Sequence, residues 1–173
     1  PAYHRLKEMG YDRYGHPLEE REANPISVYS LGGYADVRDL AHGVKQSNDI
    51  PVNVAAKAFA MALSALPENV RQNAVIVPMP GSDGRSRNMF NVARKIKELS
   101  GIDYIDVLGS VEHESLYDFK KQHPGEALPE LFFALDGRQV ERLAGHTPVI
   151  IDNVLDTGHT ISSAVEAFDG QQP

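Results

Sequence analysis

The chain has 173 residues, a formal net charge of −7, 42% hydrophobic residues and 24% charged residues. This length and composition are typical of a single soluble globular domain. The negative charge argues against broad binding to nucleic acids or anionic membranes, and no apolar run approaches the length of a membrane span. The absence of cysteine excludes disulfides and thiolate chemistry, and it fits a cytoplasmic protein.

The N-terminal third combines a polar segment with two predicted helices. Residues 1–34 are rich in glycine and proline and contain most of the tyrosines. This composition predicts either an arm whose rings pack on the domain or a lid or partner-binding arm. Apolar residues at helical spacing predict a short helix over 36–46 and a longer one over about 51–66. We expect residues 1–66 to pack on a core formed by 67–173, not to be an independent domain.

Several short apolar runs after residue 67 predict buried strands. The clearest lie at 74–78, 104–108 and 149–151, and a further candidate lies at 131–135. Strands of this kind, separated by helical segments, predict an α/β fold with a mostly parallel sheet and helices on both faces.

The segments between these strands are helical or polar. Helical periodicity predicts a helix over 87–99 that ends at Gly101, and another over about 160–168. Residues 137–144 predict a short helix or turn. The polar residues 109–130 predict a long loop or small hood, and this segment is called the hood below.

A phosphate-binding loop is predicted where the last strand meets the last helix. Ligands of open parallel sheets bind beyond the carboxyl ends of the strands, and a helix N-terminus there presents unpaired N–H groups to anions. Gly158 lets the backbone approach an anion closely, and threonines on either side add hydroxyl donors. His159 fills a position at which the residue type is expected to be incidental. This phosphate loop consists of Asp156, Thr157, Gly158, His159 and Thr160.

Two polar residues, Asp152 and Asn153, precede the phosphate loop at the end of the strand. Their oxygens can accept hydrogen bonds from adjacent sugar hydroxyls. A phosphate cradle beside acceptors for a vicinal diol describes a site for ribose 5-phosphate.

Residues 149–161 resemble the fingerprint of the type I phosphoribosyltransferases, which has four apolar residues, two acids, two apolar residues and then Asp/Thr-Thr-Gly-x-Thr. The resemblance implies that the phosphate loop holds the 5-phosphate of phosphoribosyl diphosphate (PRPP). It also implies that Asp152 and Asn153 contact the ribose hydroxyls, with Asp152 and Asp156 as catalytic residues. Asn153 replaces the second acid, which removes a charge that would stabilise a cationic ribose transition state.

A second match implies where the leaving pyrophosphate is held. Residues 75–85 resemble the family's first core strand and its pyrophosphate loop, and 87–91 are similar to a motif of the competence-factor (ComF-type) branch. Backbone amides and side chains of this loop, or Arg87 beyond it, would hold the pyrophosphate. The pyrophosphate loop consists of Pro80, Gly81, Ser82, Asp83, Gly84 and Arg85.

The resemblance covers about residues 70–168 and extends to the hood. It implies that Lys120 and Lys121 lie in a flexible loop that closes over pyrophosphate, the alternative being that they are solvated surface residues. It also implies a homodimer and a further core strand after residue 168, which residues 170–173 cannot supply.

The implied reaction transfers ribose 5-phosphate from PRPP to a nitrogenous base, with Mg²⁺ bound together with PRPP and no nucleic-acid partner. The alternative is a non-catalytic module of the same fold that senses PRPP or a nucleotide and signals to a partner. Both interpretations rest on the predicted strand at 149–151 and the phosphate loop, because a fold and a motif alone do not determine the function.

Overall fold

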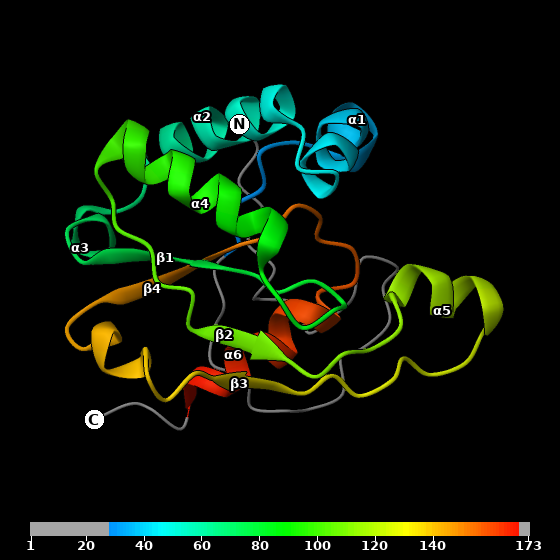
Figure 1. Cartoon of the computed structure of the whole chain (residues 1–173). Helices are drawn as coiled ribbons and strands as arrows, with labels where there is room; N and C mark the ends of the chain where they lie inside the picture. The colour runs from blue at the N-terminus through cyan, green and yellow to red at the C-terminus, as the bar shows by residue number, and fades with distance from the viewer. Residues whose placement is uncertain (1–27, 170–173) are drawn as a thin grey trace.

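A computed structural model describes residues 28–169 of the chain, so most of the predicted N-terminal arm lies outside the described residues. Helices precede and follow each parallel strand (Figure 1). In chain order the elements are α1 (Tyr34–Lys45), α2 (Asp49–Ser64), α3 (Glu68–Arg71), β1 (Ala74–Pro78), α4 (Arg87–Ser100), β2 (Leu108–Ser110), α5 (Leu116–Gln122), β3 (Phe133–Leu135), the 3₁₀ helix η1 (Val140–Leu143), β4 (Thr147–Ile151) and α6 (His159–Asp169).

The parallel part of the sheet is built around β1, whose predicted position is confirmed. β1 pairs in parallel with β4, with Ala74 opposite Thr147 and Pro78 opposite Ile151. On its other side, Ile76 forms a parallel bridge with Tyr104. Four of the five β1 residues are buried, as expected for a central strand.

The predicted strand over 104–108 is wrong in extent, because its ladder with β1 stops after one bridge. The Ile76 N–H donates to the Asp103 carbonyl, and the Ile105 N–H donates to the Ile76 carbonyl, both at 2.9 Å. The next donor toward this segment would be the N–H of residue 78, and proline has none. The chain therefore leaves the parallel ladder beyond Ile105.

The expectation of a mostly parallel sheet also needs correction. Within residues 28–169, β2 and β3 form a separate antiparallel pair, with Leu108 opposite Leu135. The Asp136 N–H donates to the Val107 carbonyl at 2.7 Å, which ties the returning strand to the segment that has left β1. The described strands are thus one parallel and one antiparallel pair, and the α/β class itself is confirmed.

Both faces of the sheet are covered, as predicted. On one face, α2 and α4 pack over Ile76 and Ile151 through residues such as Val92 and Ile96. On the other face, Ala164 of α6 packs with Val75 and Val77 and with residues of β2 and β3. Figure 1 shows α4 and α6 on opposite sides of β1 and β4.

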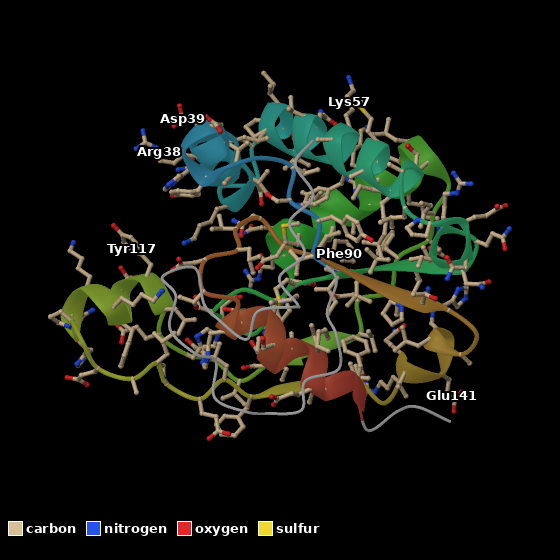
Figure 2. The ribbon with its side chains drawn as sticks, turned by 180° about the vertical axis from the view of Figure 1, so that it is seen from behind. Arg38, Asp39, Lys57, Phe90, Tyr117 and Glu141 are labelled. Atoms are coloured by element: carbon tan, nitrogen blue, oxygen red, sulfur yellow. The ribbon has the colours of Figure 1, made fainter. Side chains whose placement is uncertain are left out.

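The helix ends follow local sequence signals. α4 ends at Gly101, which has φ 76° and is the left-handed cap that the sequence predicts. α2 begins after Asn48, with Pro51 in its first turn. Its buried face contributes Ala55 and Ala56 to the core, while Lys57 points outward (Figure 2). α1 and α2 share one core cluster with β1 and α4, although the boundary placed at residue 66 stays a prediction.

The strand β4 has one paired and one open edge among the described residues. The Thr147 N–H donates to Asn73 and the Ile151 carbonyl accepts from Met79, so these residues turn their backbone groups toward β1. By the alternation of a strand, Pro148 and Ile150 turn theirs toward the open edge. In the described part of the chain no helix is both long and apolar enough to cross a membrane.

Candidate functional site

The segments that lead into the two predicted anion loops begin side by side, because β1 and β4 are neighbours and run in the same direction. Pro78 is opposite Ile151 at the carboxyl ends of these strands, and the Met79 N–H donates to the Ile151 carbonyl at 3.0 Å. The pyrophosphate loop starts just after Met79, and Asp152 comes directly after Ile151. Ligand sites of parallel sheets lie at this kind of edge. The structure therefore places the start of the pyrophosphate loop and Asp152, which precedes the phosphate loop, at one edge of the sheet.

The phosphate loop turns from β4 into α6 as the sequence predicts. Gly158 has φ 82°, a conformation that favours glycine, and a Cβ added there would meet no heavy atom within 4 Å. The Thr157 hydroxyl lies 3.4 Å from the His159 N–H, and the Ser162 N–H donates to the Gly158 carbonyl at 2.9 Å. The loop thus leads into the N-terminus of an 11-residue helix beside open space. Such a terminus favours an anion.

Asp152, which lies between β4 and the phosphate loop, has a carboxyl with a perturbed pKa. Part of the residue remains accessible, yet its carboxyl lies deep among protein atoms. Burial raises the pKa of the carboxyl to about 6, and hydrogen bonds from the Asn153 and Val154 backbones oppose that rise. The Asn153 N–H lies 2.7 Å from Asp152 Oδ1. No cationic side chain among the described residues contributes to this pKa shift, so the backbone is what holds the carboxylate.

The pyrophosphate loop is closed by its own hydrogen bonds. Gly81 donates to the Arg85 carbonyl at 2.8 Å, Gly84 donates to the Gly81 carbonyl at 2.9 Å, and the Arg85 N–H donates to the Asp83 carboxylate at 3.1 Å. These amides were expected to hold pyrophosphate. In this conformation they are already used, so the loop must change shape before they can bind a ligand. Pro80 at its start is buried, whereas Ser82 is exposed.

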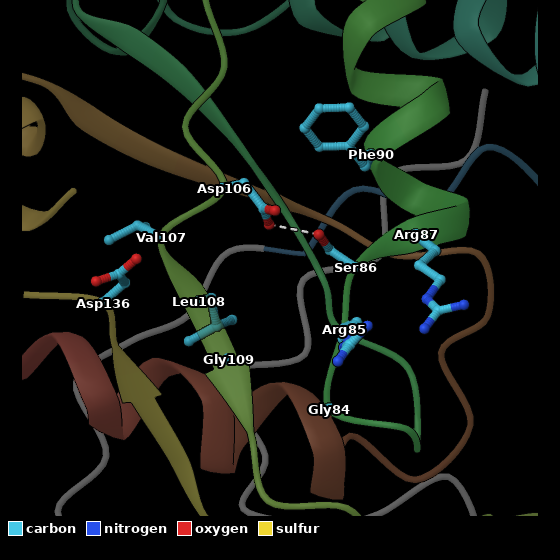
Figure 3. A pocket seen from close by; sticks show the side chains of 10 residues that line it. All are labelled: Gly84, Arg85, Ser86, Arg87, Phe90, Asp106, Val107, Leu108, Gly109 and Asp136. Atoms are coloured by element: carbon cyan, nitrogen blue, oxygen red, sulfur yellow. Dashed lines mark hydrogen bonds between the residues drawn. The ribbon is translucent and has the colours of Figure 1, made fainter. Parts of the chain in front are cut away.

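A cavity adjoins the pyrophosphate loop. It has a volume of about 470 Å³ and lies between the start of α4 and residues 106–109, the segment that follows the bridge to β1 (Figure 3). Its lining consists of Gly84, Arg85, Ser86, Arg87, Phe90, Asp106, Val107, Leu108, Gly109 and Asp136. Gly84 and Arg85 are predicted site residues, whereas none of the phosphate-loop residues lines this cavity.

Sequence reasoning missed Ser86 and Asp106 among the polar residues that line this cavity. Ser86 is 5% exposed, and its hydroxyl donates a short hydrogen bond to the Asp106 carboxylate (Figure 3). Asp106 interrupts an otherwise apolar run, which was the available signal that its side chain had a specific partner. Arg87, a predicted alternative to Arg85, pairs with Asp83 at 3.5 Å and keeps much of its side chain in solvent.

The hood reaches the phosphate loop. Lys120 on α5 forms a short ion pair with Asp156, and His159 lies 2.8 Å from the Pro129 carbonyl oxygen. Lys121 is exposed, and none of the ion pairs found in residues 28–169 includes it. The two predicted lysines therefore differ, because one contacts the phosphate loop and its neighbour faces solvent. No three His, Asp or Glu side chains of the described residues gather closely enough to hold a metal ion.

The geometry is that of an α/β protein with two loops at the carboxyl ends of adjacent parallel strands. Over 77 residues the chain is 34% identical to the bifunctional protein PyrR of Corynebacterium diphtheriae, a match that covers 44% of this chain and 37% of the relative. This partial match supports a phosphoribosyltransferase-like family. No family model and no solved structure matches the chain. The ComF-type likeness, the homodimer and the individual residue roles stay predictions.

Proposed function

We propose that this chain binds PRPP across the two loops and transfers its ribose 5-phosphate to a nitrogenous base, with release of pyrophosphate. The observation that carries the proposal is the adjacency of the carboxyl ends of β4 and β1, which are joined by the Met79–Ile151 hydrogen bond and lead into the phosphate loop and the pyrophosphate loop. A molecule with a phosphate at one end and a diphosphate at the other matches a pair of neighbouring anion loops. The partial similarity to PyrR supports the same class of protein.

Each end of PRPP has a proposed place. The 5-phosphate lies against Gly158 and the start of α6, and the ribose hydroxyls face Asp152 and Asn153. The diphosphate lies over the pyrophosphate loop, where Arg85 and Arg87 supply positive charge. Asp152 and Asn153 offer carboxylate and amide oxygens of the type that Mg²⁺ prefers, and an Mg²⁺ ion bound together with PRPP would neutralise charge on the diphosphate.

The reaction breaks the bond between ribose C1 and the diphosphate oxygen, which leaves with the electron pair, and forms a bond from C1 to a base nitrogen. Positive charge develops on the ribose as the first bond breaks. The ionised Asp152 stabilises this charge from a partly buried site, where electrostatic effects are stronger than in open water. Asp156 is the proposed acceptor of the proton that the base nitrogen loses.

Calorimetric titration of the full chain with PRPP and Mg²⁺ tests the binding step. We expect saturable binding that Gly158→Val abolishes, because a branched side chain at φ 82° strains the loop and fills space beside it. Gly101→Val is the matched control, since Gly101 has φ 76° and an added Cβ there also meets nothing within 4 Å. The control carries similar backbone strain at the end of α4. A folded chain that binds no PRPP contradicts the proposal, as does equal loss of binding in both variants.

Asn153 favours a second candidate function, a non-catalytic module that binds PRPP or a nucleotide and regulates a partner. An amide at the position of the family's second acid accepts hydrogen bonds but carries no charge for a cationic transition state. A sensor needs the binding loops and does not need that charge.

Asn153→Asp separates the two functions. For an enzyme we expect pyrophosphate release to rise by up to about a hundredfold, because the new carboxylate adds stabilisation of about 2–3 kcal/mol to the transition state. The measurement is pyrophosphate release with a panel of nitrogenous bases. For a sensor the substitution leaves turnover at background while PRPP still binds in the titration, and that result decides against the enzyme.

A further inference from the structure

Two contacts, called the two ties below, join the hood to the phosphate loop. Each of them uses a different residue of the hood and a different residue of the loop. The Lys120 ammonium of α5 pairs with the Asp156 carboxylate, 36 residues further along the chain. His159 Nε2 lies 2.8 Å from the carbonyl oxygen of Pro129, which is near the end of the hood. Because a carbonyl oxygen only accepts, Nε2 must carry the proton in this hydrogen bond. The two loop residues stand on either side of Gly158.

The start of the hood is held by the pairing of β2 with β3 and by the His113 N–H, which donates to the Ser82 carbonyl at 2.9 Å, whereas the part from α5 onward has fewer contacts among the described residues. None of the seven residues of α5 is buried, and Tyr117 on this helix is 76% exposed (Figure 2). Its ordering is local: the Ser115 side chain caps the helix, and Phe119 stacks on His123. The apolar core resumes at Leu131, after the hood. A helix without buried side chains depends more on polar contacts for its position, and among the described residues these two contacts link α5 and the end of the hood to the phosphate loop.

The two ties differ in kind. The Lys120 and Asp156 side chains are 35% and 47% exposed, so their ion pair is weak and screened by salt. The His159–Pro129 hydrogen bond is partly buried and joins a ring to a carbonyl, which makes it insensitive to salt. An anion in the phosphate loop would weaken the ion pair between Lys120 and Asp156 and leave the His159–Pro129 hydrogen bond in place.

We propose that His159 is a positioning residue that holds the hood on the phosphate loop. We also propose that an anion bound in this loop replaces Asp156 as the ionic partner of Lys120. A bound phosphate carries nearly two negative charges and therefore competes with a single carboxylate for the lysine ammonium. His159 keeps the end of the hood attached during this exchange. The first half of the proposal concerns the ligand-free protein, and the second half rests on the proposed function.

Hydrogen exchange of the ligand-free full chain tests the role of His159. His159→Ala is expected to speed exchange of the amides in residues 116–130 by about threefold to tenfold, while exchange in β1 is unchanged. His159→Gln keeps an N–H donor and is expected to restore most of the protection. Wild-type rates for 116–130 in His159→Ala, or no rescue by glutamine, overturn the positioning role.

Titration with ribose 5-phosphate tests the transfer of Lys120. Lys120→Met is expected to weaken affinity about tenfold, and Lys121→Met, the matched control on the same helix, less than about twofold. Equal weakening in both variants overturns the transfer and leaves the proposed function standing. A wild-type chain that binds no ribose 5-phosphate overturns the transfer together with the proposed function, whereas the exchange experiment still decides the role of His159.

Discussion

Replacing Asp152 by asparagine is expected to stabilise the folded protein at pH 7 by about 2 kcal/mol. Burial raises the pKa of this carboxyl from 3.8 to about 6, so the folded state holds the ionised form at a cost. Asparagine removes the charge and keeps one oxygen that can accept the Asn153 N–H. The hydrogen bond from the Val154 backbone is the expected loss, and it makes the gain smaller than the pKa shift alone implies.

The pH dependence of this gain has a definite sign. With the pKa raised in the folded state, the native protein binds the Asp152 proton more tightly than the unfolded chain between about pH 4 and pH 6. The contribution of this group to the free energy of unfolding therefore falls as pH rises through that range. Wild type and Asp152→Asn should be nearly equal in stability at pH 4 and differ fully above about pH 6.5. Urea unfolding at a series of pH values measures this difference.

The same substitution should impair the proposed reaction, which makes stability and function diverge. Loss of the carboxylate removes charge stabilisation from the ribose and is expected to lower pyrophosphate release about a hundredfold. Asp39→Asn is the control, because the Asp39 side chain is 98% exposed and its replacement should change stability by less than about 0.5 kcal/mol. A less stable Asp152→Asn protein at pH 7 would show that contacts to the carboxylate outweigh its burial.

Gly84→Ala is expected to destabilise the protein by about 3 kcal/mol or more. A Cβ at Gly84 would lie 2.4 Å from the backbone oxygen of Ser110, in a conformation with φ 78°. The backbone conformation costs an alanine about 1 kcal/mol, and the clash adds more because backbone on both sides must move. The pyrophosphate loop and β2 would separate, and urea unfolding measures the loss.

Gly101→Ala isolates the clash from the backbone conformation. Gly101 has φ 76°, and an added Cβ meets nothing within 4 Å, so this variant carries the conformational cost without the contact. We expect it to lose about 1 kcal/mol. Similar losses in the two variants would mean that the pyrophosphate loop moves away from Ser110 easily, contrary to the packing seen here.

The sequence predicted the elements whose signals are local. β1, β4 and the helix that ends at Gly101 follow from apolar periodicity and from a glycine cap. The predicted extent of the strand at 104–108 failed because pairing depends on the partner, and here the partner is a proline without an N–H at position 78. Single-sequence patterns do not show which residue will lie opposite.

The candidate site shows the same difference between features set by local sequence and features set by distant partners. The turn at Gly158 and the place of Asp152 follow from the motif, since both depend on a few neighbouring residues. The hydrogen bond between Ser86 and Asp106 and the contact from His159 to Pro129 join residues 20 and 30 positions apart. Their existence depends on how β1, α4 and the hood are arranged in space. His159, which fills the variable position of the motif, thus has a specific contact with Pro129 in this chain.

The proline at position 148 has a consequence for association between molecules. Open strand edges act as templates on which another chain can add, and this is a common route to aggregation. Among the described residues the open edge of β4 presents backbone groups of Pro148 and Ile150, and the first of these has no N–H to offer. A strand added there would lack a hydrogen bond near the start of β4. Pro148 thus lowers the tendency of this edge to pair with a strand of a second chain, and it lies outside both anion loops.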